Sequence, residues 1–135
     1  MWVKDHHMHL QNYKIIEDLI ASIYTKDISD FGDRSYYPQI LKLVSRINLK
    51  NFNNENLVCE DAVFCSTSNG ASINLISRSL GLPRETVRRK ISELLNLNWL
   101  IKDNSKIYVS QEWRKKNLEN NEIILKELIE LSRKI

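Results

Sequence analysis

The stretch Ala71–Ser110 constrains the fold more than any other part of the chain, because apolar and turn-forming residues alternate in it at short, regular intervals. Apolar residues recur at helical spacing over positions 73–80. Ser72, directly before them, is a residue type that caps helix N-termini. Gly81, directly after them, predicts the end of the helix, because glycine adopts the left-handed conformation at little cost. A short helix over residues 73–80 is therefore expected.

A second helix is predicted from about Arg84 to Leu97. Pro83 precedes it, and proline is favoured at a helix start because the N–H that it lacks would be unpaired there. The apolar stripe of this helix consists of Val87, Ile91, Leu94 and Leu95. The opposite side carries Arg84, Glu85, Arg88, Arg89 and Lys90. A helix, a short glycine turn and a second helix form the helix-turn-helix pattern, whose second helix enters the DNA major groove by its N-terminal residues.

A β-hairpin is predicted after the two helices. Trp99–Ile101 and Ile107–Val109 are rich in aromatic and β-branched residues, and the five residues between them have the composition of a turn. Lys102 and Lys106 lie at the two shoulders of that turn. The predicted fold class is mainly α, a winged helix-turn-helix with a short β-hairpin wing, flanked by N-terminal helices and a long C-terminal helix.

Residues 81–89 read Gly-Leu-Pro-Arg-Glu-Thr-Val-Arg-Arg and resemble the G-x-S-R-E-T-V-x-R element of the cyclic-AMP receptor protein/FNR family of bacterial transcription regulators. In that family the first Arg, the Glu and the last Arg contact base edges. The resemblance therefore implies base-reading roles for Arg84, Glu85 and Arg89, which suits the pairing of Arg with guanine and of Glu with cytosine. Pro83 departs from the family pattern, which usually has a serine or another capping residue there.

The resemblance covers Ser72–Ser110 and does not extend upstream, where nothing corresponds to the cyclic-nucleotide β-roll of that family. The plan of the whole chain instead resembles the MarR family of small dimeric regulators. This second resemblance is architectural only, because the D-x-R signature of the MarR wing is replaced by Lys-Asp-Asn-Ser at residues 102–105.

Contacts to DNA phosphates are expected from a wider set of residues. They are Ser72, Thr86, Arg88, Lys90, Lys102 and Lys106. Ser72 is included because free N–H groups at a helix N-terminus attract anions. Residues 70–116 hold 10 Lys/Arg and 4 Asp/Glu, a net charge of +6, whereas the whole chain carries +3. Such a concentration is typical of a phosphate-binding surface, and Arg114, Lys115 and Lys116 extend it beyond the wing.

Three segments are expected: residues 1–54 as an N-terminal helical segment for support or dimerisation, residues 55–110 as the winged helix-turn-helix, and residues 111–135 as a C-terminal helix for dimerisation. The N-terminal segment contains a predicted helix over about Leu10–Asp30 and another that starts near Tyr37. The central segment is expected to begin with a helix over Glu55–Cys65. The C-terminal helix carries an apolar repeat, which a second subunit is expected to cover; the alternative is that this helix forms a lid on its own domain.

Other classes of protein receive little support. No apolar run approaches the length of about 18 residues that spans a bilayer, and no secretory signal opens the chain, so a cytoplasmic location is expected. There is no Gly-rich phosphate loop, H-E-x-x-H or Gly-flanked nucleophilic Ser, and we predict neither catalytic residues nor a cofactor. Cys59 and Cys65 lack zinc-site spacing; reduced thiols are expected, with a redox switch as the alternative. His6, His7 and His9 are not expected to form a metal site.

The sequence thus predicts a sequence-specific, double-stranded DNA-binding transcriptional regulator that acts as a homodimer. Its operator, its effector and the sign of its regulation are not predicted. One alternative is a winged helix that serves as a protein-interaction adaptor. Another is a replication or partition initiator of a mobile element that uses the same fold at an origin.

Overall fold

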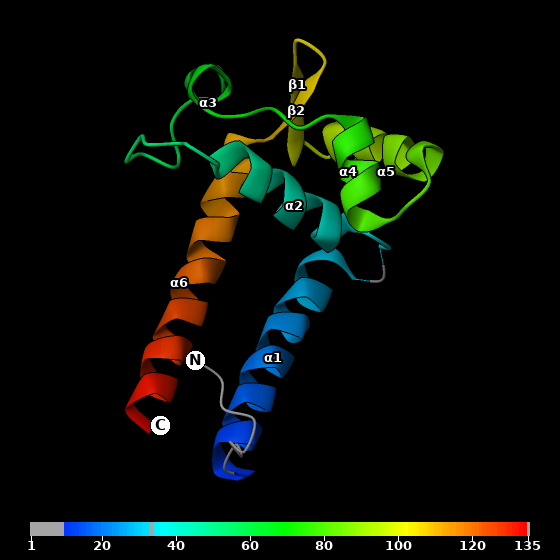
Figure 1. Ribbon diagram of the computed structural model, residues 1–135. Helices are drawn as coiled ribbons and strands as arrows, with labels where there is room; N and C mark the ends of the chain where they lie inside the picture. Colours follow the sequence, from blue (N-terminus) through cyan, green and yellow to red (C-terminus); the bar gives the residue numbers. More distant parts are fainter. Residues whose placement is uncertain (1–9, 33, 135) are drawn as a thin grey trace. The chain divides into compact units, whose positions relative to one another are not determined.

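The computed structural model describes residues 10–32 and 34–134, without the side chains of residues 28–31. These residues form a mainly helical structure with a two-stranded antiparallel hairpin and a long C-terminal helix, as predicted (Figure 1). The helices are α1 (Leu10–Phe31), α2 (Tyr37–Leu49), α3 (Asp61–Thr67), α4 (Ile73–Leu80), α5 (Arg84–Asn96) and α6 (Gln111–Lys134). The strands are β1 (Leu100–Asp103) and β2 (Lys106–Val109). The chain divides into two compact units, Met1–Gly32 with Glu119–Ile135, and Asp33–Leu118.

The helix pair α4–α5 begins and ends at the residues that the sequence indicates. The side-chain oxygen of Ser72 accepts a hydrogen bond from the Leu75 N–H at 3.1 Å and so caps α4. Gly81 ends α4 with a φ of 66°, a conformation that residues with a Cβ rarely adopt. Pro83 is the N-cap of α5. These local signals fix a three-residue connection between the two helices.

The core of the larger unit lies where α2, the helix pair and the hairpin meet. α2 packs against α4, α5 and β2, and α5 packs against β1. Among the fully buried side chains are Ile40 and Val44 from α2, Ile76 from α4, Val87 and Leu94 from α5, and Leu100 and Val109 from the hairpin. α2, which is predicted as part of the N-terminal segment, therefore belongs to the same compact unit as the helix pair.

The hairpin is tighter than predicted. β1 pairs with β2 from Leu100↔Val109 to Asp103↔Lys106, so that the turn contains two residues rather than five. These residues, Asn104 and Ser105, have φ angles of 50° and 64°, which suits a two-residue turn of the type that matches the strand twist. On the other edge of β2, Ala71 and Ile107 exchange two backbone hydrogen bonds of 2.8 and 2.9 Å. The segment before α4 is thereby joined to the hairpin.

The predicted helix over Glu55–Cys65 is wrong in its first half. Residues 55–60 are not helical, and α3 begins only at Asp61. The side chain of Asn54 accepts a hydrogen bond from the Asn56 N–H at 3.0 Å, and the side chain of Asn56 accepts one from the Val58 N–H at 3.1 Å. Such Asx turns compete with helical hydrogen bonds and keep the segment in a loop.

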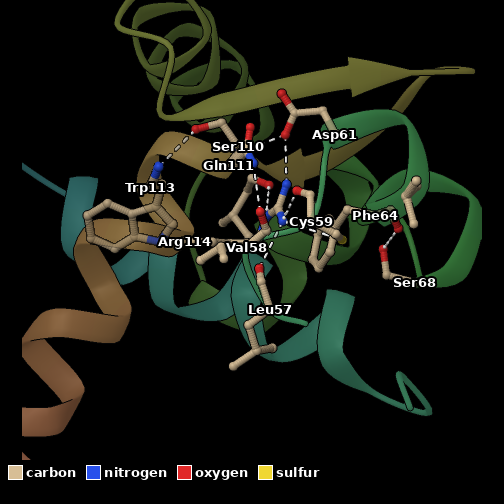
Figure 2. Close-up of polar contacts among 12 residues, drawn as sticks. Leu57, Val58, Cys59, Asp61, Phe64, Ser68, Ser110, Gln111, Trp113 and Arg114 are labelled. Atoms are coloured by element: carbon tan, nitrogen blue, oxygen red, sulfur yellow. Dashed lines mark hydrogen bonds and ion pairs between the residues drawn. The ribbon is translucent and has the colours of Figure 1, made fainter. Parts of the chain in front are cut away.

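Arg114, near the start of α6, holds this loop in place (Figure 2). Its guanidinium donates to the carbonyl oxygens of Leu57 and Cys59, both at 2.9 Å, and to the carboxylate of Asp61 at 2.7 Å. It also lies 3.9 Å from the ring centroid of Phe64 and is almost fully buried. The expected phosphate contact of Arg114 is therefore wrong, because its charge is used inside the fold.

The smaller unit consists of α1 and residues 119–134 of α6. Ser22 donates a hydrogen bond to Glu127 at 3.1 Å, and a groove of about 250 Å³ is lined by Ile15, Leu19 and Leu131 together with polar side chains. α1 matches its predicted bounds within one residue, and α6 runs through Asn120 and Asn121 without a break. Within residues 10–32 and 34–134, no helix combines the length and apolar character needed to cross a membrane.

Candidate nucleic-acid interface

The exposed face of α5 lies opposite its buried stripe. Val87, Ile91 and Leu94 are buried in the core, and the three predicted base-reading residues, Arg84, Glu85 and Arg89, are all exposed. Arg88, Ser92 and Asn96 are exposed on the same side. Because α5 begins at Arg84, these three arginines and the glutamate all lie in its N-terminal half. Ser92 and Asn96 were not among the predicted site residues, although their spacing from Arg88 already places them on this face.

Glu85 and Arg88 form an ion pair within this face. Arg88 Nε donates to Glu85 Oε2 at 3.1 Å, and Arg88 Nη2 donates to Glu85 Oε1. The side chains of Arg88 and Glu85 are 59% and 73% exposed, so the pair is accessible to a ligand. The hydrogen bond and the positive charge of Arg88 lower the pKa of Glu85, and the same contacts raise the pKa of Arg88. Both groups are therefore charged over the physiological range.

Lys90 occupies a different side of α5 from the exposed arginines. Its Nζ lies 5.7 Å from the ring centroid of Tyr37, in α2, and 3.8 Å from Glu93 Oε1. Its side chain is only 19% exposed. Lys90 thus contributes to the contact between α2 and α5, which separates it from the other residues predicted to bind phosphate. Thr86 is half-buried beside the core face.

Tyr37 and Glu93 complete the contact between α2 and α5. The Tyr37 hydroxyl donates to Glu93 Oε1 at 2.6 Å. Burial, followed by the hydrogen bond to Glu93 and the charge of Glu93, raises the pKa of Tyr37 to about 12. The same hydrogen bond is the main cause that lowers the pKa of Glu93. The orientation of α5 on the core therefore depends on a polar contact as well as on apolar packing.

The remaining predicted phosphate ligands lie at the start of α4 and in the hairpin. Ser72 is half-buried at the N-terminus of α4, with its oxygen in the cap described above. Lys102 and Lys106 are exposed, one on each strand near the turn. The backbone of Gly70 packs closely against Lys106, and a Cβ at position 70 would collide with the Lys106 side chain. Figure 1 shows the hairpin turn projecting away from α2.

The two lysines that follow Arg114 differ in their surroundings. Lys115 is exposed, whereas Lys116 is half-buried with its Nζ 5.5 Å from the ring centroid of Trp99. Of the basic cluster predicted beyond the wing, only Lys115 is thus both exposed and outside the contacts described above.

Cysteine and metal chemistry adds no second site in the described part of the chain. Cys59 is buried, Cys65 is half-buried, and both are free thiols. Burial, reinforced by the negative charges of Asp103 and Asp61, raises the pKa of Cys65 to about 11, so its thiol is protonated at neutral pH. No cluster of three His, Cys, Asp or Glu side chains suited to a metal ion occurs among the described residues. His6, His7 and His9 lie outside them.

Comparison of the chain with protein-family models, with curated proteins and with solved structures gives no match.

Proposed function

We propose that this protein is a sequence-specific, double-stranded DNA-binding transcriptional regulator with a winged helix-turn-helix. In this proposal α4 and α5 are the helix-turn-helix, and β1–β2 is the wing. α2 is the first helix of the module, in place of the segment Glu55–Cys65. The packing of α2 on α4 and α5, and of the hairpin on α2 and α5, supports this arrangement.

One observation carries the proposal. The N-terminal half of α5 exposes Arg84, Glu85, Arg88 and Arg89, while the other side of the same helix is buried. A major groove of B-DNA admits one α-helix, and its base edges offer guanine acceptors to Arg and cytosine donors to Glu. An exposed helix with Arg and Glu in its first two turns suits that groove.

Phosphate contacts would surround this helix. Lys102 and Lys106 of the hairpin are exposed and carry charges that phosphates attract. The N-terminus of α4, capped by Ser72, is a second candidate, because helix N-termini orient N–H groups towards anions. Thr86 and Arg88 remain candidates on α5. We omit Lys90, since its ammonium group lies beside Tyr37 and Glu93.

We further propose that the protein acts as a homodimer through its smaller unit. Tyr13, Ile20 and Tyr24 of α1 are 54%, 42% and 66% exposed, and Leu125 and Ile129 of α6 are 55% and 43% exposed. No side chain described in this unit is fully buried. Helices that carry apolar residues outside their mutual contact need a further partner. A second copy supplies the same two helices, which would complete a four-helix arrangement.

The test is selection from a pool of random duplex DNA by the full-length protein, with sequencing, at two salt concentrations. The proposal predicts enrichment of a near-palindrome that contains G·C pairs, with half-sites about 34 Å apart. Retention without enrichment would indicate a non-specific DNA binder. No retention would favour the protein-interaction adaptor. If the enriched motif lies at an origin rather than at a promoter, the replication or partition initiator is favoured.

A further inference from the structure

The pairing of Glu85 with Arg88 has consequences for the way in which α5 contacts a base pair. One guanidinium donates to both oxygens of the Glu85 carboxylate, from Nε and from Nη2. Bidentate pairs of this kind fix the plane of the carboxylate as well as its distance. Arg88 stands at an unspecified position of the G-x-S-R-E-T-V-x-R element that residues 81–89 resemble, so the resemblance itself assigns Arg88 no role.

We propose that Arg88 is a positioning residue that determines specificity by holding Glu85 in its base-reading orientation. The proposal rests on the DNA-binding function proposed above and assigns Arg88 a role other than that of a simple phosphate contact. The base pair concerned is one that presents an amino donor in the major groove. Among the bases, cytosine N4 is the usual partner of Glu.

The geometry leaves Glu85 able to act while it is paired. Each carboxylate oxygen has two acceptor positions, and Arg88 occupies one on each oxygen. The remaining positions are available to a base, and 73% of the Glu85 side chain is exposed. The carboxylate can therefore accept from a cytosine amino group without losing Arg88.

The charge of Arg88 also matters in a groove lined by phosphates. An unpaired glutamate would be repelled there, because both DNA strands carry negative charge at short intervals. Arg88 offsets that charge at the first turn of α5. The contact is weak in free solution, as exposed ion pairs are, but it strengthens when DNA displaces water from around it. The Glu85–Arg88 ion pair is therefore expected to hold the carboxylate more firmly in the DNA complex than in the free protein.

The experiment compares the full-length wild type with Arg88→Lys, Arg88→Ala and Glu85→Gln, by selection from random duplexes and by titration of the selected site over salt concentration. Lysine retains a charge for phosphate but lacks the planar fork. We therefore expect Arg88→Lys to keep the salt dependence of the wild type. We also expect it to lose preference at the base pair affected by Glu85→Gln, by about 5- to 100-fold.

The contrary result is equally specific. If Arg88→Lys keeps the full base preference, or if Arg88→Ala weakens all sequences equally and lowers the salt slope by about 1, Arg88 is a phosphate contact and the inference fails alone. If the wild type enriches no motif, the proposed function fails and this inference fails with it. Thermal unfolding of each variant checks that the exposed substitutions leave the fold intact.

Discussion

The side-chain oxygen of Asn48 accepts a hydrogen bond from the Val109 N–H at 2.9 Å, although 61 positions separate the two residues. The Asn48 amide group also donates to the carbonyl oxygens of Ile107, at 3.2 Å, and Asn69, at 2.6 Å. Asn48 is fully buried in the last turn of α2. Its carboxamide thus meets one edge of β2 as a neighbouring strand would, and it fixes the hairpin on the helical core.

Replacement of Asn48 by Leu tests this contact. The Val109 N–H would lose its side-chain acceptor in the interior, and an unsatisfied buried group costs about 1–3 kcal/mol. We expect Asn48→Leu to lower the free energy of unfolding by that amount in urea titrations. Asn69→Ala is the matched control, because the Asn69 side chain is exposed and donates a hydrogen bond to the Lys50 carbonyl oxygen at the surface. Equal losses from the two variants would contradict the role of Asn48.

Arg114 provides a second test of the larger unit. Arg114→Met removes the donor to three backbone carbonyl oxygens, those of Leu57, Cys59 and Val109. At about 1 kcal/mol for each acceptor, we expect a loss of about 3 kcal/mol in the free energy of unfolding. Lys115→Met is the control, because Lys115 is the next residue and is exposed. It should change the free energy of unfolding by no more than about 0.5 kcal/mol. A small effect of Arg114→Met would show that the loop over residues 55–60 does not depend on it.

Tyr37 predicts a pH dependence at the alkaline end. The pKa of Tyr37 is raised from 10 to about 12 in the folded protein, so folding favours its protonated form. The contribution of Tyr37 to the free energy of unfolding is therefore complete below pH 10, and it is lost as the pH rises towards 12. The stability difference between wild type and Tyr37→Phe should shrink over that range, by about 1–3 kcal/mol. Chemical unfolding at pH 8, 10 and 11 measures it, and a constant difference would contradict the prediction.

The proposed dimer predicts a change in mass upon substitution in α1 or α6. Ile20→Lys and Leu128→Lys each replace a large apolar side chain of the smaller unit by a charged one. Ile20 is 42% exposed and Leu128 is 44% exposed. We expect both to convert a dimer into a monomer in light scattering after size exclusion. Val63→Lys in α3, at 42% exposure, is the matched control and should remain dimeric. A wild type that is monomeric at micromolar concentration would contradict the proposal.

The helix pair could be predicted because its signals are local. Ser72, Gly81 and Pro83 each act on the backbone within a few residues, and each occupies the expected position in the structure. The hairpin was predicted for the same reason. Its turn was predicted too long, since Asn104 and Ser105 both adopt positive φ and the pairing of the strands extends by two residues in β1 and by one residue in β2.

The loop over residues 55–60 and the role of α2 could not be predicted in this way. The loop depends on Arg114, more than 50 residues away in sequence, and on side-chain turns that no apolar periodicity reveals. The position of Asn48 in the predicted helix gives no sign of its role, because its hydrogen-bond partners in β2 become its neighbours only when the hairpin packs on α2. In the candidate interface, the spacing of apolar residues predicted the exposed face of α5. The pairing of Arg88 with Glu85, and that of Lys90 with Glu93, depends on the directions of the side chains.

The measurement that tests the central claim most directly is the affinity of Arg84→Ala and Lys106→Ala for the selected duplex and for a scrambled duplex. If Arg84 reads a base, Arg84→Ala loses about 1–3 kcal/mol on the selected duplex and little on the scrambled one. Lys106→Ala should weaken both duplexes equally and reduce the salt dependence. An equal loss on both duplexes for Arg84→Ala would contradict base reading by the N-terminal half of α5.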